Sequence, residues 1–313
     1  MKKDKVVIIG AGFVGACCAY TMMLGGTAGE IVLIDIDRER LEGEVLDLSH
    51  GLPFVQPVQI KAGDYADCKD AELVIITAGA AQRPGESRLS LIQRNVDIFK
   101  NIIPQITRYN TECILLVVTN PVDVITYVAQ KLSGFSPRRV IGSGTVLDSA
   151  RFRYLLGEHC RVAPNSVHGY VIGEHGDSEV CAFSATHIAG MSMEEICNTC
   201  ENGCMTNCRS ELSQSVRTAA YRIIEGKGAT YYAVALAVRR IADAILRNEG
   251  TVLSVSSLLA GQYGFDDVYV SLPCVVDAGG ISKVLTPSLA PEEMEGLNHS
   301  VTVLKEAVAS VKW

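Results

Sequence analysis

Two short stretches combine residue types that can move a proton and bind an anion. His175 lies between glycines in residues 173–177, and Asp148 and Arg151 are three residues apart at the start of a predicted helix. The latter two side chains therefore share one helix face. A histidine titrates near neutral pH, and an arginine can bind a carboxylate through two parallel hydrogen bonds. Each residue could instead serve structure: His175 in a turn, Asp148 as a helix cap and Arg151 in a surface ion pair.

Two further polar stretches follow predicted strands. Residues 119–123 come directly after an apolar strand predicted over 114–118. Residues 79–88 join another strand to a long helix and contain Gln82 and Arg88. Because a parallel sheet binds its ligand beyond the carboxyl ends of its strands, both segments are candidates for substrate contacts.

A glycine-rich turn near the beginning of the chain has the pattern of a dinucleotide site. Gly10, Gly12 and Gly15 match G-x-G-x-x-G between a predicted strand and a predicted helix. The first glycine permits a tight turn, the second lets backbone amides approach a pyrophosphate, and the third lets the helix pack on the sheet. Asp35 ends the next strand, where a carboxylate accepts hydrogen bonds from ribose hydroxyls and repels a 2′-phosphate. The pattern predicts NAD rather than NADP.

The first half of the chain alternates β-branched runs with helical patterns. Strands are predicted over 6–9, 31–34, 59–62, 73–77, 114–118 and 140–142, and helices over 13–24, 39–48, 90–109 and 122–132. This alternation predicts an α/β fold with a doubly wound parallel sheet, a Rossmann domain over residues 1–144.

After about residue 145 the pattern changes. Helices are predicted over 147–158, about 193–225, 232–247 and 291–311, with a group of strands over 252–259, 268–276 and 281–284. We expect a mixed α+β catalytic domain over residues 145–313. The sequence has no repeat or long linker, which indicates that the two domains pack closely.

Composition narrows the class of protein and its surroundings. The 313 residues carry a net charge of −7 without a basic run, which argues against nucleic acid as a partner. Eleven cysteines, an odd number, favour reduced thiols in a cytoplasmic protein. Lysines precede an uncharged stretch over 6–29, but its six glycines argue against a signal peptide or a membrane segment.

Five motifs in chain order resemble the L-lactate dehydrogenase family. They are the glycine-rich turn, Thr-Asn-Pro-Val-Asp at 119–123, Leu-Asp-Ser-Ala-Arg-Phe-Arg at 147–153, Gly-Glu-His-Gly-Asp at 173–177 and Lys-Gly-Ala-Thr-Tyr-Tyr at 227–232. The resemblance is to bacterial members of the lactate/malate dehydrogenase superfamily and covers essentially the whole chain. It implies a Rossmann domain followed by a catalytic domain, NAD as cofactor and reversible reduction of pyruvate to (S)-lactate.

The resemblance also implies a role for each candidate residue. His175 matches the proton donor and acceptor, Asp148 the carboxylate that orients it, and Arg88 a loop residue that polarises the ketone oxygen. The substrate-binding residues would be Gln82, Arg88, Asn120, Arg151 and Thr230. The cofactor-binding residues would be Gly10, Gly12, Val14, Gly15, Asp35, Arg40, Tyr65, Gly79, Ala80, Thr119, Asn120 and Thr145. No metal site is implied.

Gln82 bears on the choice between two related substrates. Malate dehydrogenases resemble this chain but carry arginine at the matching position, where it pairs with the second carboxylate of oxaloacetate. A neutral Gln82 leaves that carboxylate unpaired, so the sequence favours pyruvate. Arg83 is adjacent, and a shift of one residue in the loop would favour malate dehydrogenase instead.

Regulation and assembly also follow from the resemblance. Arg153 and His168 match the pair through which bacterial members bind fructose 1,6-bisphosphate between subunits. We therefore expect an allosteric site at these residues and a homotetramer.

Four cysteines form a cluster that the resemblance does not explain. Cys197, Cys200, Cys204 and Cys208 would share one side of a helix, where thiols could bind a metal, sense redox state or be incidental. A non-catalytic NAD-binding thiol sensor is therefore an alternative to an enzyme.

Overall fold

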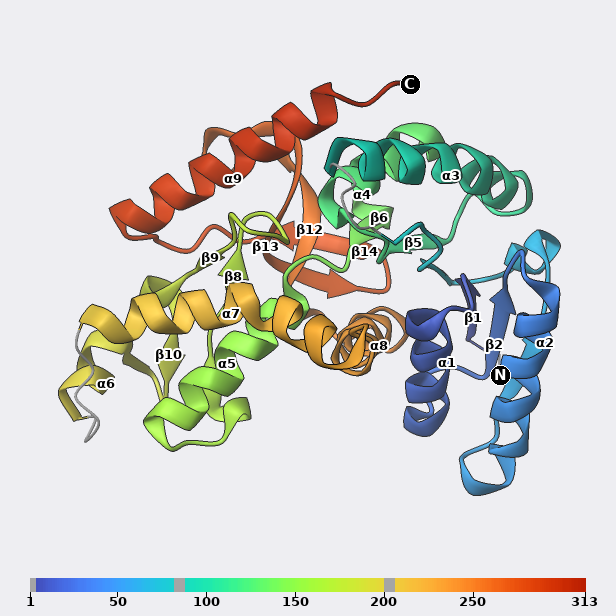
Figure 1. Ribbon diagram of the computed structural model, residues 1–313, viewed down its shortest axis with the longest axis horizontal. Coiled ribbons are helices and arrows are strands. Elements are labelled where there is room, and N and C mark those ends of the chain that lie inside the picture. Colours follow the sequence, from blue (N-terminus) through green and yellow to red (C-terminus); the bar gives the residue numbers. More distant parts are fainter. Residues whose placement is uncertain (1–3, 82–87, 200–205) are drawn as a thin grey trace.

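The computed structural model describes residues 4–81, 88–199 and 206–313 of the chain. Its centre is a nine-stranded sheet with the order β14-β13-β12-β6-β5-β4-β1-β2-β3 (Figure 1). The first half of the chain supplies β1 (Lys5–Ile9), β2 (Glu30–Ile34), β3 (Gln59–Ala62), β4 (Leu73–Ile76), β5 (Ile114–Val117) and β6 (Val140–Gly142). All pairings among these six strands are parallel. Their order, 3-2-1-4-5-6, is that of a Rossmann domain, so the predicted doubly wound sheet is confirmed.

Alternate residues of each parallel strand face opposite layers of helices. On β1, Val7 and Ile9 join one apolar core, which includes residues of α3 (Arg88–Tyr109) and α4 (Val122–Ser133). Val6 and Ile8 join the other, with α1 (Phe13–Gly25), α2 (Arg38–His50) and α8 (Tyr232–Leu246). Each fully buried aliphatic side chain stabilises the fold by about 1.5–3 kcal/mol relative to exposure. Burial on both faces explains the near-continuous apolar strands.

The antiparallel strands of the second half extend the same sheet. β12 (Thr251–Ala260), β13 (Asp266–Asp277) and β14 (Gly280–Val284) form a meander, and β12 meets β6 where Ser256 lies opposite Gly142. A Cβ at Gly142 would lie 2.7 Å from the Cβ of Ser256, so this junction requires glycine. The division that we propose after residue 144 therefore separates the parallel and antiparallel parts of one continuous sheet.

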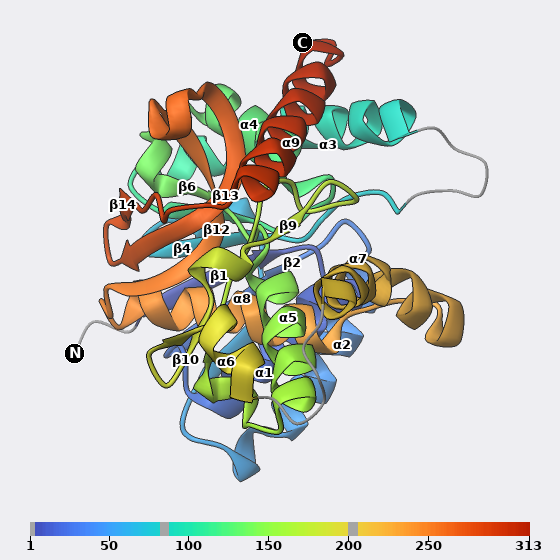
Figure 2. The same cartoon turned by 90° about the vertical axis from the view of Figure 1, so that its left-hand side faces the viewer.

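The remaining helices and short strands belong to the second half of the chain. They are α5 (Val146–Cys160), α6 (Met193–Thr199), α7 (Thr206–Lys227) and α9 (Pro291–Ala309), with the short strands β7 (Val167–His168), β8 (Val171–Ile172), β9 (Val180–Cys181), β10 (His187–Ile188) and β11 (Met191–Ser192). α5 and α7 pack against each other (Figure 2). The helical stretch predicted over about 193–225 is described as α6 and α7, since residues 200–205 lie outside the description.

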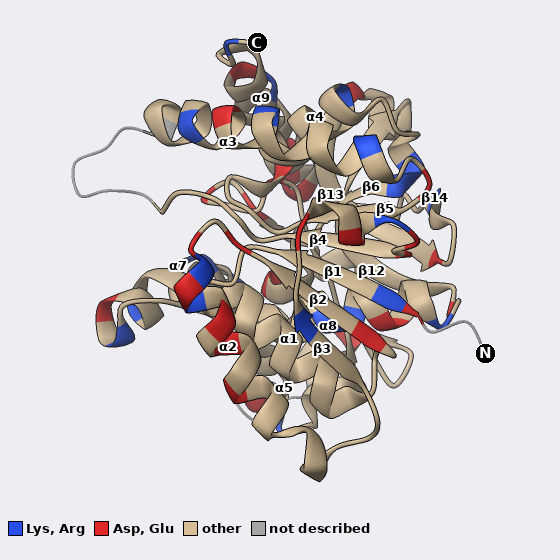
Figure 3. Ribbon diagram, turned by 90° about the vertical axis from the view of Figure 1, so that its right-hand side faces the viewer, with Lys and Arg blue, Asp and Glu red and all other residues tan. Residues whose placement is uncertain are grey.

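Two surface properties bear on partners. Positively and negatively charged residues are interspersed along the ribbon in the view of Figure 3, and the net charge of the chain is −7. No helix within the described ranges is both long enough and apolar enough to cross a bilayer.

Candidate active site

The candidate site begins at the carboxyl ends of the parallel strands. Gly10 follows β1, Asp35 follows β2, and Asn120 lies just beyond β5. The polar segments predicted to form a ligand crevice therefore meet at one edge of the sheet.

The glycine-rich turn has the shape of an anion cradle. Gly10 has a φ of +104°, and a Cβ there would lie 2.6 Å from the backbone nitrogen of Ala78. A Cβ on Gly15 would lie 1.8 Å from the carbonyl oxygen of Gly10, so the helix packs on the turn only with glycine. Gly12 caps α1 without a side-chain bond, and no atom lies within 4 Å of its Cβ position. The open helix N-terminus at Gly12 fits a pyrophosphate.

Asp35 is held beside this turn by backbone donors. Its Oδ2 accepts a hydrogen bond from the Ala11 N–H at 2.6 Å, and its Oδ1 accepts one from the Asp37 N–H at 2.9 Å. Each carboxylate oxygen keeps capacity for another donor, as a ribose hydroxyl requires. The Arg40 guanidinium lies 5.5 Å from the ring centroid of Phe13, the first residue of α1, at the side of the turn.

Asn95, which the sequence analysis missed, fixes the loops opposite this turn. It is fully buried on α3; its Oδ1 accepts from the Ala80 N–H at 2.7 Å, and its amide donates to the Asn120 carbonyl at 2.7 Å. Thr119 donates to the Ala78 carbonyl at 2.7 Å. A polar residue on the apolar face of a helix, between Ile92 and Phe99, was the available sequence signal.

The second cluster joins His175, Asp148 and Arg151. The Nδ1 of His175 lies 2.5 Å from Asp148 Oδ2, and Arg151 Nη1 donates to Asp148 Oδ1 at 2.7 Å. The Asp148 side chain is 2 % exposed, whereas that of His175 remains 24 % exposed. Asp148 therefore bridges an imidazole and a guanidinium that both reach accessible space.

Electrostatics in this cluster favour the charged forms of both partners. Burial opposes an imidazolium, but the Asp148 carboxylate outweighs it and raises the pKa of His175 to about 9. Burial would also raise the pKa of Asp148, yet His175 and Arg151 hold that pKa below its ordinary value. At neutral pH, His175 therefore carries a proton on each ring nitrogen, and its Nε2 is available to a substrate.

Asp123 holds the backbone of the histidine loop in place, and the sequence analysis also missed it as a functional residue. Its Oδ2 accepts from the His175 backbone N–H at 2.8 Å, and its Oδ1 accepts from the Ser256 hydroxyl at 2.6 Å. Complete burial raises the pKa of its carboxyl. Asp123 thus connects α4, β12 and the histidine loop.

The other predicted residues have the following positions. Thr230 is half-buried just before α8, Arg153 is half-buried on α5, and His168 is exposed on β7. Thr145 is fully buried, and its hydroxyl lies 2.5 Å from the Val171 carbonyl, so its side chain is used within the protein. Val14 lies on α1, Tyr65 begins the short helix 65–68, and Gly79 lies beyond β4.

The predicted substrate loop is described only at its ends. Gln82 and Arg83 lie outside the described residues, and only the backbone of Arg88, at the start of α3, is described.

The cysteine cluster is described only in part. Cys197 lies on α6, and Cys208 on α7 has its Sγ 3.4 Å from Nε2 of His159 on α5. Cys200 and Cys204 lie outside the described residues. No disulfide bond joins any two of the nine cysteines that the structure describes.

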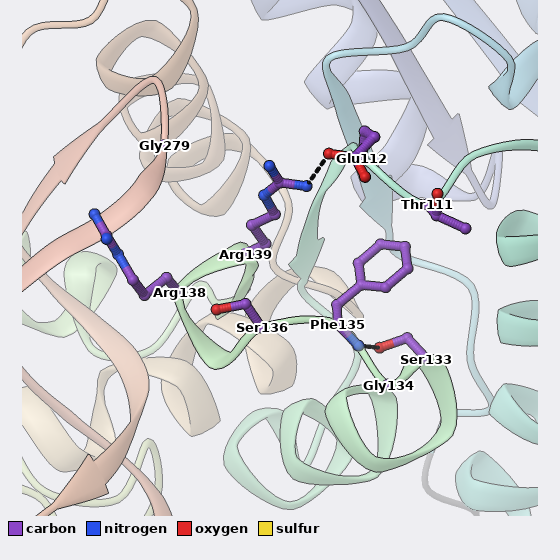
Figure 4. Close-up of a pocket in the computed structure, with 9 residues that line it drawn as sticks. All are labelled: Thr111, Glu112, Ser133, Gly134, Phe135, Ser136, Arg138, Arg139 and Gly279. Carbon is purple, nitrogen blue, oxygen red and sulfur yellow. Dashed lines mark hydrogen bonds and ion pairs between the residues drawn. The ribbon is translucent and has the colours of Figure 1, made fainter.

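A cleft of about 630 Å³ lies elsewhere (Figure 4). It is lined by segments that precede β5 and β6, so it opens at the amino ends of the strands, opposite the cluster. Its Arg139 pairs with Glu112 at 2.7 Å, and Arg138 donates to the Ile281 carbonyl at 2.8 Å. These arginines serve structural contacts, and the cleft contains none of the predicted site residues.

Comparisons with known proteins agree with this geometry. Residues 4–142 match the model of the lactate/malate dehydrogenase NAD-binding domain, and residues 145–312 match that of the lactate/malate dehydrogenase α/β C-terminal domain. The chain belongs to the lactate/malate dehydrogenase family. Its relatives include an L-lactate dehydrogenase of Acetivibrio thermocellus, 56 % identical over 98 % of this chain and 97 % of the relative. Another, from Thermoanaerobacterium saccharolyticum, is 53 % identical over 97 % and 98 % of the two chains.

Solved structures of the family have the same fold. The minor L-lactate dehydrogenase of Enterococcus mundtii, crystallised with ligands, has a TM-score of 0.97 and 41 % identity, covering 100 % of this chain and 99 % of that one. Family membership, the Rossmann fold and NAD as the cofactor of this lactate/malate dehydrogenase are thus confirmed. The open N-terminus of α1 and the Asp35 carboxylate fit the pyrophosphate and ribose of NAD.

Proposed function

We propose that the protein is an L-lactate dehydrogenase that reversibly reduces pyruvate to (S)-lactate with NADH. The observation that carries this proposal is the Asp148 bridge between a protonated His175 and Arg151. A proton donor beside a guanidinium suits a 2-oxo acid, which has a carbonyl next to a carboxylate. The presence of all three residues of this trio, His175, Asp148 and Arg151, also favours an enzyme over a non-catalytic thiol sensor.

NADH, when bound, supplies the hydride in this reaction. His175, Asp148 and Arg151 would carry out the proton transfer and bind the substrate. His175 donates its Nε2 proton to the substrate carbonyl oxygen, which becomes the hydroxyl of lactate, and Asp148 stabilises the imidazolium and fixes its orientation. Arg151 has further N–H donors beyond its bond to Asp148 and binds the substrate carboxylate with them.

Three more residues complete the proposed pocket. Asn120 orients the substrate carbonyl, Thr230 lines the pocket, and Arg88 polarises the ketone oxygen in a site from which water is excluded. We also propose a cytoplasmic location, because eleven cysteines, an odd number, favour reduced thiols.

Substrate choice is the first test of this proposal. In a direct assay of NADH oxidation, we expect pyruvate to be preferred over oxaloacetate. Substitution Gln82→Arg should raise kcat/KM for oxaloacetate relative to pyruvate about 100-fold, because a positive charge then pairs with the second carboxylate. The control is Arg83→Gln, which leaves the preference unchanged if Gln82 is the selector.

An unchanged preference in Gln82→Arg would argue against this assignment. A wild type that prefers oxaloacetate, and an Arg83→Gln variant that loses this preference, would instead support malate dehydrogenase.

We also propose a homotetramer in which Arg153 and His168 bind fructose 1,6-bisphosphate between subunits. The large apolar side chains exposed on α1 and α8, which pack together, support self-association: Phe13, Tyr20, Leu24, Tyr232 and Leu236. We expect the bisphosphate to lower the half-saturating pyruvate concentration about 5-fold or more. Superimposable saturation curves with and without it would contradict this regulation.

A further inference from the structure

Glu179 is a buried acid next to the catalytic pair that the mechanism above does not use. Glu179 is 3 % exposed and lies directly before β9. A carboxylate oxygen of Glu179, a ring nitrogen of His175 and a carboxylate oxygen of Asp148 all lie within 4.8 Å of one another. A third ionisable group therefore lies close enough to the His175 imidazole to influence its charge.

The hydrogen bonding of Glu179 does not compensate for burying a charge. Its Oε1 is buried and has no hydrogen-bond partner among the described residues. The nearby Arg217 of α7 directs its Nη2 to the backbone carbonyl of Glu179 at 3.2 Å, not to the carboxylate. Burying an ionised carboxylate without a paired donor is costly, so the neutral acid is favoured.

The charged surroundings act in both directions on this carboxyl. Asp148 opposes its ionisation, whereas His175, Arg151 and Arg217 favour it. Burial, the largest effect, and then Asp148 raise the pKa of Glu179 to about 8.

Glu179 also lines a cleft of about 280 Å³ between the histidine loop, α7 and α9. The cleft is also lined by Glu174 and Asp177 of the loop, by Arg217 and by His299 of α9.

We propose that Glu179 is a positioning residue that sets the proton affinity of His175 and extends the pH range over which the imidazole remains a proton donor. The carboxyl is neutral at neutral pH and loses its proton as the solution becomes alkaline. The resulting negative charge stabilises the imidazolium, so His175 keeps its proton to higher pH. The same charge raises the pH at which His175 becomes the neutral imidazole that accepts a proton in the reverse reaction.

The matched variants are Glu179→Gln and Asp177→Asn. Glu179→Gln keeps the shape and removes the charge, so it should lower the pKa of His175 by about 0.5 to 1 unit. Asp177 lies on the same loop but is exposed and accepts a hydrogen bond from the Tyr221 hydroxyl at 2.9 Å. Solvent screens its charge, so Asp177→Asn should leave the pKa of His175 unchanged.

Two measurements separate this proposal from the proposed function on which it rests. The first is the alkaline midpoint of kcat/KM for pyruvate reduction, and the second is NMR titration of the His175 imidazole in isotope-labelled protein. We expect both midpoints to fall in Glu179→Gln and neither to move in Asp177→Asn. A wild type without pyruvate turnover would overturn the proposed function alone, since the imidazole titration still reports on Glu179.

The proposal is overturned if the His175 titration in Glu179→Gln superimposes on that of the wild type, whatever the kinetic profile. It is equally overturned if Asp177→Asn shifts the titration as much, because any loss of negative charge would then have the effect. If Glu179→Gln does not fold, Glu179→Leu fills the same buried volume without a charge and has the same expected result.

Discussion

Substitution His175→Gln is expected to lower kcat/KM for pyruvate reduction by about 10³- to 10⁴-fold. Glutamine can still donate a hydrogen bond to the carbonyl oxygen, but it has no proton to transfer as negative charge develops there. The Asp148 carboxylate, now without the imidazolium, keeps Arg151 at 2.7 Å, so carboxylate binding should change far less than turnover. The loss should therefore appear mainly in kcat.

The measurement is steady-state NADH oxidation, with NADH binding followed separately by fluorescence. His50→Gln, at the exposed end of α2, is the control histidine and should have wild-type rates. A loss below about 10-fold in His175→Gln would remove His175 as the proton donor, because a positioned acid contributes at least about 10²-fold.

Most of the fold was predictable because its signals are local. The β-branched runs at 6–9 and 31–34 became β1 and β2 with boundaries within one residue, since burial on both sheet faces demands continuous apolar sequence. The role of β12 was not predictable in this way. Its pairing with β6 depends on contact between Ser256 and Gly142, more than a hundred residues apart, and no local pattern encodes that contact.

The same distinction between local and tertiary signals applies to the candidate site. The charged groups of the trio stood out because His175, Asp148 and Arg151 occur in recognisable motifs, and the structure brings them together. Asp123 and Glu179 escaped notice because their significance comes from burial beside His175, which is a tertiary property.

Arg151→Gln is expected to lower kcat/KM for pyruvate about 10³-fold, chiefly through a higher KM. The Arg151 side chain is 13 % exposed and its guanidinium is bonded to Asp148, which restricts the orientation of its remaining N–H groups. Its removal leaves the substrate carboxylate in a largely water-free site without a paired charge. The KM for NADH should stay near the wild-type value, because the cofactor contacts that we propose at the glycine-rich turn and Asp35 do not involve Arg151.

A lysine at this position separates charge from geometry. Arg151→Lys retains the positive charge but loses the fork, so it should recover only part of the lost kcat/KM. The control is Arg240→Gln, which breaks the surface ion pair with Glu249 at 2.6 Å and should leave both KM values unchanged. If Arg151→Lys were as active as the wild type, a point charge would suffice and bidentate binding would be wrong. If Arg151→Gln left the KM for pyruvate unchanged, the substrate carboxylate would have to bind elsewhere.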